Sequence, residues 1–93
     1  MNAISGTVLQ MEPGTQDEAE AFIDQKANEI SSIAGIINWG SIYTGENEVT
    51  VIAVYGNRAS AENATKFVNE VLADFAQFVT VPPVRDIYDA RWN

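Results

Sequence analysis

Residues Glu48–Tyr55, with the sequence EVTVIAVY, decide the fold of this chain because they are apolar at both odd and even positions. Successive side chains of a β-strand point to opposite faces of a sheet, so both faces of this strand need a cover. A single sheet with helices on one side covers only one face. The stretch therefore predicts a central strand whose second face packs on something else, and we expect a second copy of the chain there.

The segments around this strand alternate between the periodicities of strands and helices. Pro13-Gly14 and Gly45-Glu46-Asn47 mark turns between them. We expect strands over residues 3–11, 36–44, 48–55 and 84–92, and helices over residues 15–34 and 60–79. This βαββαβ order is the α+β arrangement called ferredoxin-like, with a four-stranded antiparallel sheet whose first and third strands are central. Ninety-three residues suffice for one such domain, residues 1–93.

Polar residues in front of both helices predict how the helices begin. Thr15 and Glu18 have the spacing of a capping box, in which each side chain bonds the other's backbone N–H. Ser60 is suited to cap the second helix, and Asn57 is the alternative. Both helices therefore begin within a few residues of a strand end.

The composition restricts the chemistry that the chain can carry out. Thirteen acidic and five basic residues give a net charge of −8 and a pI near 4.1. Such a surface repels phosphate backbones, so we expect no nucleic-acid partner. The chain has neither Cys nor His, which removes disulfides, thiolate metal sites, the commonest metal ligand and the usual general base. We expect no metal and no other cofactor.

No stretch of the sequence predicts insertion into a membrane. Residues 1–4 (MNAI) lack the basic start and the apolar run of a signal peptide. No segment approaches the ~20 apolar residues that span a bilayer. We therefore expect a cytoplasmic, acidic protein. A chain this small has a marginal core, and homodimer formation is the remaining way to bury more surface.

Four short stretches resemble the dimeric α+β barrel proteins, and among them the antibiotic biosynthesis monooxygenase-like group. Residues 10–14 (QMEPG) resemble the Pro-Gly end of that group's first strand, and residues 33–37 (IAGII) resemble the start of its second. Residues 51–55 (VIAVY) and 60–64 (SAENA) resemble its third strand and the small residues that begin its second helix. The resemblance implies a barrel formed by two copies, with an interior cavity.

Members of this superfamily include cofactor-free oxygenases of activated aromatics, haem-degrading enzymes and isomerases, and the chain departs from several of them. Haem-degrading relatives use an Asn on the first strand and a His on iron. Here the first strand offers Ser5 and Thr7, and the chain has no His. Isomerase and lyase relatives with a His base are disfavoured on the same ground. The resemblance therefore favours a cofactor-free oxygenase over the other activities.

The candidate ligand pocket is built around aromatic residues. Trp39 and Tyr43 share one face of the second strand, and Tyr55 lies on its hairpin partner, so these rings are suited to a flat apolar ligand. Asn38 is added because the resemblance implies an Asn as well as a Trp in such a pocket. The alternative is that Trp39 and Tyr43 fill the dimer interface, where aromatic residues are enriched.

Arg85, near the start of the last strand, completes the candidate pocket. Its guanidinium is suited to a carboxylate or phenolate of a ligand. The alternative is a structural pairing with Asp86, with Asp89 or with a helix C-terminus.

Two functions follow from these observations. The first is a cofactor-independent monooxygenase that acts on an activated, quinol-like aromatic molecule in the barrel cavity, with catalytic residues unassigned. The second is a non-catalytic dimeric module that binds a small molecule or has a structural role. The lack of His and Cys favours the second function, whereas the resemblance favours the first.

Overall fold

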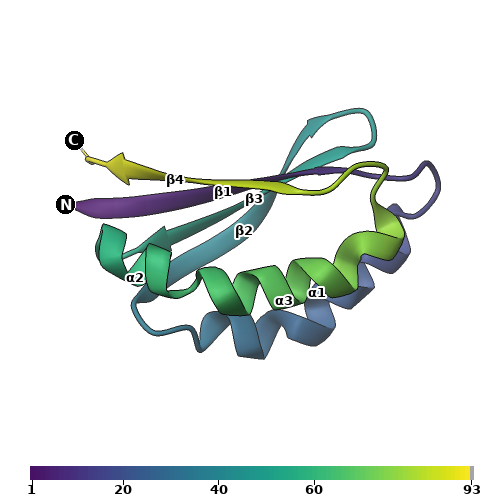
Figure 1. The fold of residues 1–93 in the computed structure, drawn as a ribbon. Helices are drawn as coiled ribbons and strands as arrows, with labels where there is room; N and C mark the ends of the chain where they lie inside the picture. The colour runs from purple at the N-terminus through teal and green to yellow at the C-terminus, as the bar shows by residue number, and fades with distance from the viewer. Residues whose placement is uncertain (93) are drawn as a thin grey trace.

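The computed structural model describes residues 1–92 of the 93-residue chain (Figure 1). The elements follow in the order β1 (Asn2–Gln10), α1 (Gln16–Ser31), β2 (Ile36–Gly45), β3 (Glu48–Tyr55), α2 (Arg58–Asn63), α3 (Thr65–Phe75), the 3-10 turn η1 (Ala76–Phe78) and β4 (Val84–Ala90). The predicted βαββαβ order is confirmed, with the second helix divided into α2 and α3. Asn93, the last residue of the predicted domain, lies outside the described residues.

The four strands form one antiparallel sheet in the order β2-β3-β1-β4. The first and third strands are therefore central, as predicted. Figure 1 shows α1, α2 and α3 together on one side of the sheet, with the other side uncovered. Within residues 1–92, no helix is both long enough and apolar enough to cross a bilayer.

The central strands alternate between a buried face and an open face. Residues at odd positions, such as Leu9 and Tyr55, are buried beneath the helices. The even-numbered Val8 is 37% exposed, and Ile52 and Val54 are only half-buried. The two apolar faces predicted for residues 48–55 are therefore confirmed, and the chain itself covers one of them.

Aromatic residues close the end of the helix layer near the start of α1. Phe22 of α1 meets Phe75 and Phe78, with ring centroids 5.6 and 5.9 Å away, and these two rings lie 5.2 Å from one another. Phe75 and Phe78 are buried against Leu9. This aromatic cluster forms part of the core, and Phe67 lies about two turns before Phe75 in α3.

The start of α1 differs from the capping-box prediction, and the start of α2 decides between Ser60 and Asn57 as its cap. Thr15 precedes α1, but its hydroxyl donates to the carbonyl of Glu12 at 2.6 Å and makes no cap bond. Asn57, rather than Ser60, caps α2, because its side-chain oxygen accepts from the backbone N–H of Ser60 at 2.8 Å. The extended backbone of Asn57 allows this bond.

Asn57→Ala is expected to lower the free energy of unfolding by about 1 kcal/mol, because one backbone donor of α2 loses its acceptor. Ser60→Ala is the control, since Ser60 contributes only its backbone N–H to the cap. Urea unfolding followed by circular dichroism measures both. A larger loss for Ser60→Ala than for Asn57→Ala would contradict the cap assignment.

Candidate functional site

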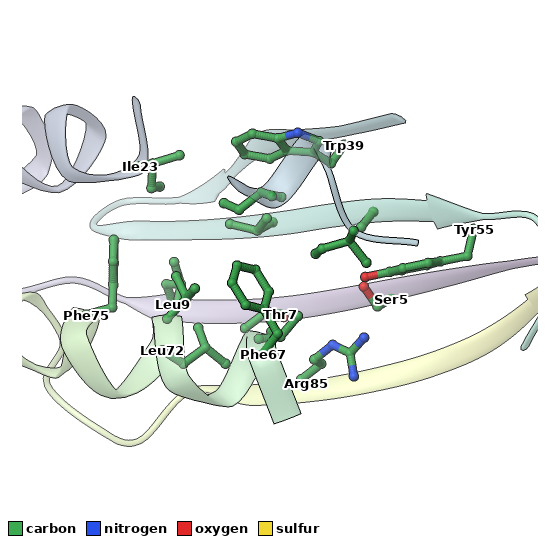
Figure 2. Close-up of a pocket in the computed structure, with 16 residues that line it drawn as sticks. Ser5, Thr7, Leu9, Ile23, Trp39, Tyr55, Phe67, Leu72, Phe75 and Arg85 are labelled. Carbon is green, nitrogen blue, oxygen red and sulfur yellow. The ribbon is translucent and has the colours of Figure 1, made fainter. Parts of the chain in front are cut away.

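A cavity of about 80 Å³ lies between the sheet and the helices, within one chain (Figure 2). Its lining comes from the helix-facing side of all four strands and from α1 and α3. The strands contribute Ser5, Thr7, Leu9, Trp39, Val51, Ala53, Tyr55 and Arg85, the helices contribute Ile23, Ile30, Phe67, Val68, Val71, Leu72 and Phe75, and Ile33 comes from the loop after α1. This cavity is not the barrel interior expected from the sequence, because it lies on the opposite face of the sheet.

Three of the five residues predicted for the pocket line this cavity. Trp39 and Arg85 reach it from β2 and β4, the two edge strands, and Tyr55 reaches it from the central strand β3. Figure 2 shows Trp39 and Arg85 on opposite sides of the cavity. Trp39 pairs with Ala53 across the sheet and faces the helices, so its ring is not on the open face where a second sheet would pack.

The other two predicted residues, Asn38 and Tyr43, do not line this cavity. Asn38 pairs with Val54, on the open face, and its side-chain oxygen accepts from the backbone N–H of Trp39 at 2.9 Å. Tyr43 lies beyond the cavity on the helix-facing side, is 62% exposed, and donates from its hydroxyl to a carboxylate oxygen of Glu20 at 2.5 Å.

Ser5 and Thr7 line the cavity although the sequence analysis did not select them. Both are 4% exposed, and they alternate along β1 with Ala3 and Leu9, which are also buried. Within residues 1–92 neither hydroxyl takes part in a side-chain hydrogen bond. The signal available in the sequence was two polar residues at strand spacing on the apolar face of a central strand.

Arg85 brings a positive charge to the cavity wall. One terminal nitrogen donates to the Thr65 hydroxyl and the other to the Ala61 carbonyl in the last turn of α2, both at 2.9 Å. The remaining donor, Nε, is buried and has no hydrogen-bond partner. Of the structural pairings predicted for Arg85, the structure therefore shows the one with the C-terminal end of a helix. Asp86 lies on the opposite face, and Asp89 is 3.6 Å from Arg58.

Trp39 is held in place as a wall of the cavity. Its indole Nε1–H donates to the hydroxyl of Ser31, the last residue of α1, at 2.9 Å. This bond ties edge strand β2 to the end of α1. The bond from Tyr43 to Glu20 ties the same two elements nearer the start of α1. The bond therefore fixes the indole at the cavity, which Ile30 and Ile33 also line.

The cavity has one polar end in otherwise apolar surroundings. Arg85, Ser5, Thr7 and Tyr55 supply the polar atoms, and Figure 2 shows the hydroxyl of Tyr55 pointing toward Ser5. The lining residues include no Asp, Glu or Lys. Such a site is suited to holding a small apolar molecule by one polar group and to stabilising negative charge on it. It supplies no carboxylate or amine as a general base.

Solved structures share this fold over nearly the whole chain. SnoaB, a cofactor-independent oxygenase from Streptomyces nogalater, is similar with a TM-score of 0.77 and 14% identity, covering 99% of this chain and 95% of its own. A candidate antibiotic biosynthesis monooxygenase from Caulobacter crescentus CB15 gives 0.78 and 17%, covering 98% and 91%. A conserved protein from Methanosarcina mazei Go1 gives 0.83 and 13%, covering 98% and 94%.

These comparisons establish the fold. The chain is an α+β protein with the ferredoxin-like fold of antibiotic biosynthesis monooxygenase-like proteins, and the resemblance found in its sequence is confirmed at that level. No protein-family model and no curated protein matches the sequence. The structures that share the fold include an oxygenase and a protein without a stated activity. Activity therefore has to be argued from the cavity.

Thr7→Val is expected to leave the free energy of unfolding unchanged to within about 1 kcal/mol, because within residues 1–92 the hydroxyl makes no side-chain hydrogen bond that the substitution would remove. Thr44→Val is the matched control. Its hydroxyl bonds Glu48 at 2.6 Å and Thr50 at 2.9 Å, so that substitution should be destabilising. Urea unfolding measures both. A clear loss of stability in Thr7→Val would show that this hydroxyl has a structural partner.

Tyr43→Phe is expected to return the pKa of Glu20 toward its ordinary value. Hydrogen bonds from Tyr43 and then Gln16 lower that pKa in the folded chain, and the bond to Glu20 with its charge raises the pKa of Tyr43. The bond thus stabilises the fold above the unfolded pKa of Glu20 and below that of Tyr43. It is lost as pH falls through the folded Glu20 pKa or rises through the folded Tyr43 pKa.

A carboxyl-detected NMR titration of Glu20 measures this shift. Tyr88→Phe is the control, since Tyr88 lies on the open face of the sheet and pairs with Ile4. An unchanged Glu20 titration in Tyr43→Phe would show that the bond does not persist in solution.

Proposed function

We propose that this chain is a cofactor-independent monooxygenase that acts on a small, activated, quinol-like aromatic molecule. The observation that carries the proposal is the apolar cavity with a half-buried arginine at one end, whose Nε has no hydrogen-bond partner within residues 1–92. SnoaB, which has the same fold, is a cofactor-independent oxygenase. The proposed site residues are Trp39, Tyr55 and Arg85, joined by Ser5 and Thr7, while Asn38 and Tyr43 act outside the cavity.

The proposed reaction needs no group beyond the substrate and oxygen. A hydroquinone monoanion transfers an electron to O₂, and the resulting radicals combine to form a C–O bond at a ring carbon. The peroxide O–O bond then breaks with loss of water, leaving a carbonyl at that carbon. The products are one hydroxyquinone and one water, and all four electrons come from the hydroquinone.

The side chains have separate roles in this proposal. Arg85 stabilises the anionic oxygen of the substrate, which favours its ionisation in an apolar site. The indole of Trp39 forms a flat wall against which the ring stacks. The isoleucines of α1 and Phe67 of α3 keep bulk water away from the reactive anion. Because the lining has no general base, the substrate has to lose its proton to solvent or arrive ionised.

The alternative function is a non-catalytic module that binds a small molecule in the same cavity. The observation that favours it is the lining, which contains no carboxylate or amine to take up a proton. In that case Arg85 and the hydroxyls select the ligand without activating it.

Oxygen uptake with hydroquinone as substrate tests the enzyme proposal. Uptake above the rate of spontaneous oxidation is expected with the unchanged chain, and Trp39→Phe is expected to reduce it because Phe lacks the bond to Ser31 that fixes the ring. Trp92→Phe is the control, since Trp92 is 63% exposed and lies outside the cavity lining. Uptake no faster than spontaneous oxidation would exclude this activity. Equal uptake rates in the unchanged chain, Trp39→Phe and Trp92→Phe would show that the cavity takes no part in the reaction.

We also propose that a second copy of the chain covers the open face of the sheet. This face consists largely of apolar side chains, namely Ile4, Val8, Ile42, Ile52, Val54, Val84 and Tyr88. Its strands carry only two charged residues on this side, Glu48 and Asp86, in a chain of net charge −8. An almost uncharged face is suited to a partner of like charge, and a copy of this chain is such a partner.

The surface of the open face is also uneven, and side chains of a partner can fill its hollows. The row Tyr88-Ile4-Val54 runs across three strands, and a neighbouring row contains Gly6 and Gly40. A Cβ at either glycine would meet nothing within 4 Å. Ile52 stands between the two glycines, so each glycine leaves a small hollow beside the ridge, a shape in which side chains of a facing sheet interdigitate. We place this dimer in the cytoplasm.

The homodimer predicts a urea midpoint of unfolding that rises with protein concentration, because dissociation accompanies unfolding. Val54→Asp, on the open face, is expected to remove this dependence. Val81→Asp is the matched control, since Val81 is 52% exposed in the segment before β4 and lies outside the sheet. A midpoint independent of concentration in the unchanged chain would contradict the dimer.

A further inference from the structure

We infer that the polar end of the cavity binds the negatively charged oxygen of an organic anion whose apolar body is no larger than one ring. Arg85 is the residue that recognises the charge. The inference rests on the proposed function in placing the ligand in the cavity between the sheet and the helices, and it adds the charge and size of that ligand.

The first step is the charge of Arg85, which the chain itself leaves uncompensated. Its guanidinium bonds two neutral groups, the Thr65 hydroxyl and the Ala61 carbonyl. The ion pairs within residues 1–92 involve Arg58 and not Arg85. Arg85 is half-buried, so water offsets only part of the cost of placing a cation beside an apolar cavity, and an anion would offset more of it. The chain has 13 acidic residues, yet none of those within residues 1–92 pairs with Arg85. The position beside the guanidinium is therefore open to an anionic ligand.

The second step is the direction of the unused hydrogen-bond donors. The two bonds of Arg85 hold its terminal nitrogens toward α2 and α3, while Nε stays buried and without a partner. Thr7 pairs with Arg85 across β1 and β4, and Ser5 is two residues along the same face. The guanidinium group and two hydroxyls therefore line the same part of the cavity, which suits an anionic oxygen.

The third step is size. An apolar cavity of about 150 Å³ holds one benzene ring, whereas this cavity has about 80 Å³. A ligand body larger than one ring therefore exceeds the volume beneath α1 and α3, and even one ring requires lining side chains to move. The remaining lining around the polar end is aliphatic or aromatic, so the body of the ligand has to be apolar.

Three probe molecules test the inference on the unchanged protein. Benzoate and benzamide have the same shape and differ in charge, and 2-naphthoate keeps the charge but adds a fused ring. Titrations followed by amide NMR are expected to show benzoate shifting Ser5, Thr7 and Arg85, and binding at least about tenfold more tightly than benzamide. Binding of 2-naphthoate is expected to be weaker than that of benzoate. Equal affinity for benzoate and benzamide, tighter binding of 2-naphthoate, or no benzoate binding would overturn the inference.

Two variants assign the charge to Arg85. Arg85→Gln is expected to weaken benzoate binding at least about tenfold, with Arg85→Lys in between because Lys keeps the charge but loses the Nε donor. Arg58→Gln is the control, since Arg58 lies at the surface and pairs with Glu62. Unchanged benzoate affinity in a folded Arg85→Gln would overturn the assignment. If Arg85→Gln does not fold, the three probes on the unchanged protein decide the inference.

Binding and oxygen uptake separate this inference from the proposed enzyme. Arg85-dependent benzoate binding without oxygen uptake from hydroquinone would support the anion site and contradict the proposed oxygenase activity. Oxygen uptake that benzoate does not inhibit would support the proposed oxygenase activity and contradict the anion site.

Discussion

The two apolar faces of β3 are the constraint on which the rest of the structure depends. The helices lie on one side of the sheet, so they bury Val49, Ala53 and Tyr55 and leave Ile52 and Val54 half-buried on the other side. Residues 1–92 contain no further element that covers that side. We propose that a second copy of the chain covers it, and the cavity lies on the other side, beneath the helices.

The helix-facing side combines stability with a binding site, and the two demands conflict there. Leu9 and Phe75 belong to a close-packed cluster, whereas Ser5, Thr7 and Arg85 place polar atoms on the same buried face. Each such atom costs stability unless something bonds to it. A ligand that bonds to these polar atoms offsets that cost. The same atoms therefore lower the stability of the chain without ligand and, in the proposal, recognise the ligand.

Much of the fold could be predicted from the sequence because it depends on periodicity and turns. The strand order followed from the element order, and the turn at residues 45–47 fixed the β2–β3 hairpin. The division of the second helix at Ala64 was missed because its apolar pattern continues through the break. The capping box at Thr15 was also wrong, because the hydroxyl donates to the carbonyl of Glu12, three residues earlier, instead of accepting from the backbone of α1.

The candidate site was predictable only in part. Trp39, Tyr55 and Arg85 were selected for their chemistry, and the register brings them to one cavity. Asn38 was selected with Trp39, yet neighbours in a strand face opposite ways, which places Asn38 on the open face. Which side of the sheet holds the cavity depends on how far the helices stand from the strands. Side-chain packing between layers sets that distance, and no local pattern encodes it.

The native mass of the unchanged chain in solution tests the central claim most directly, because the claim is that one chain cannot cover both faces of its sheet. Light scattering on a size-exclusion column gives this mass. The account predicts twice the 10.2 kDa of the chain. A single-chain mass at micromolar concentration would mean that the open face meets water, and it would contradict the account.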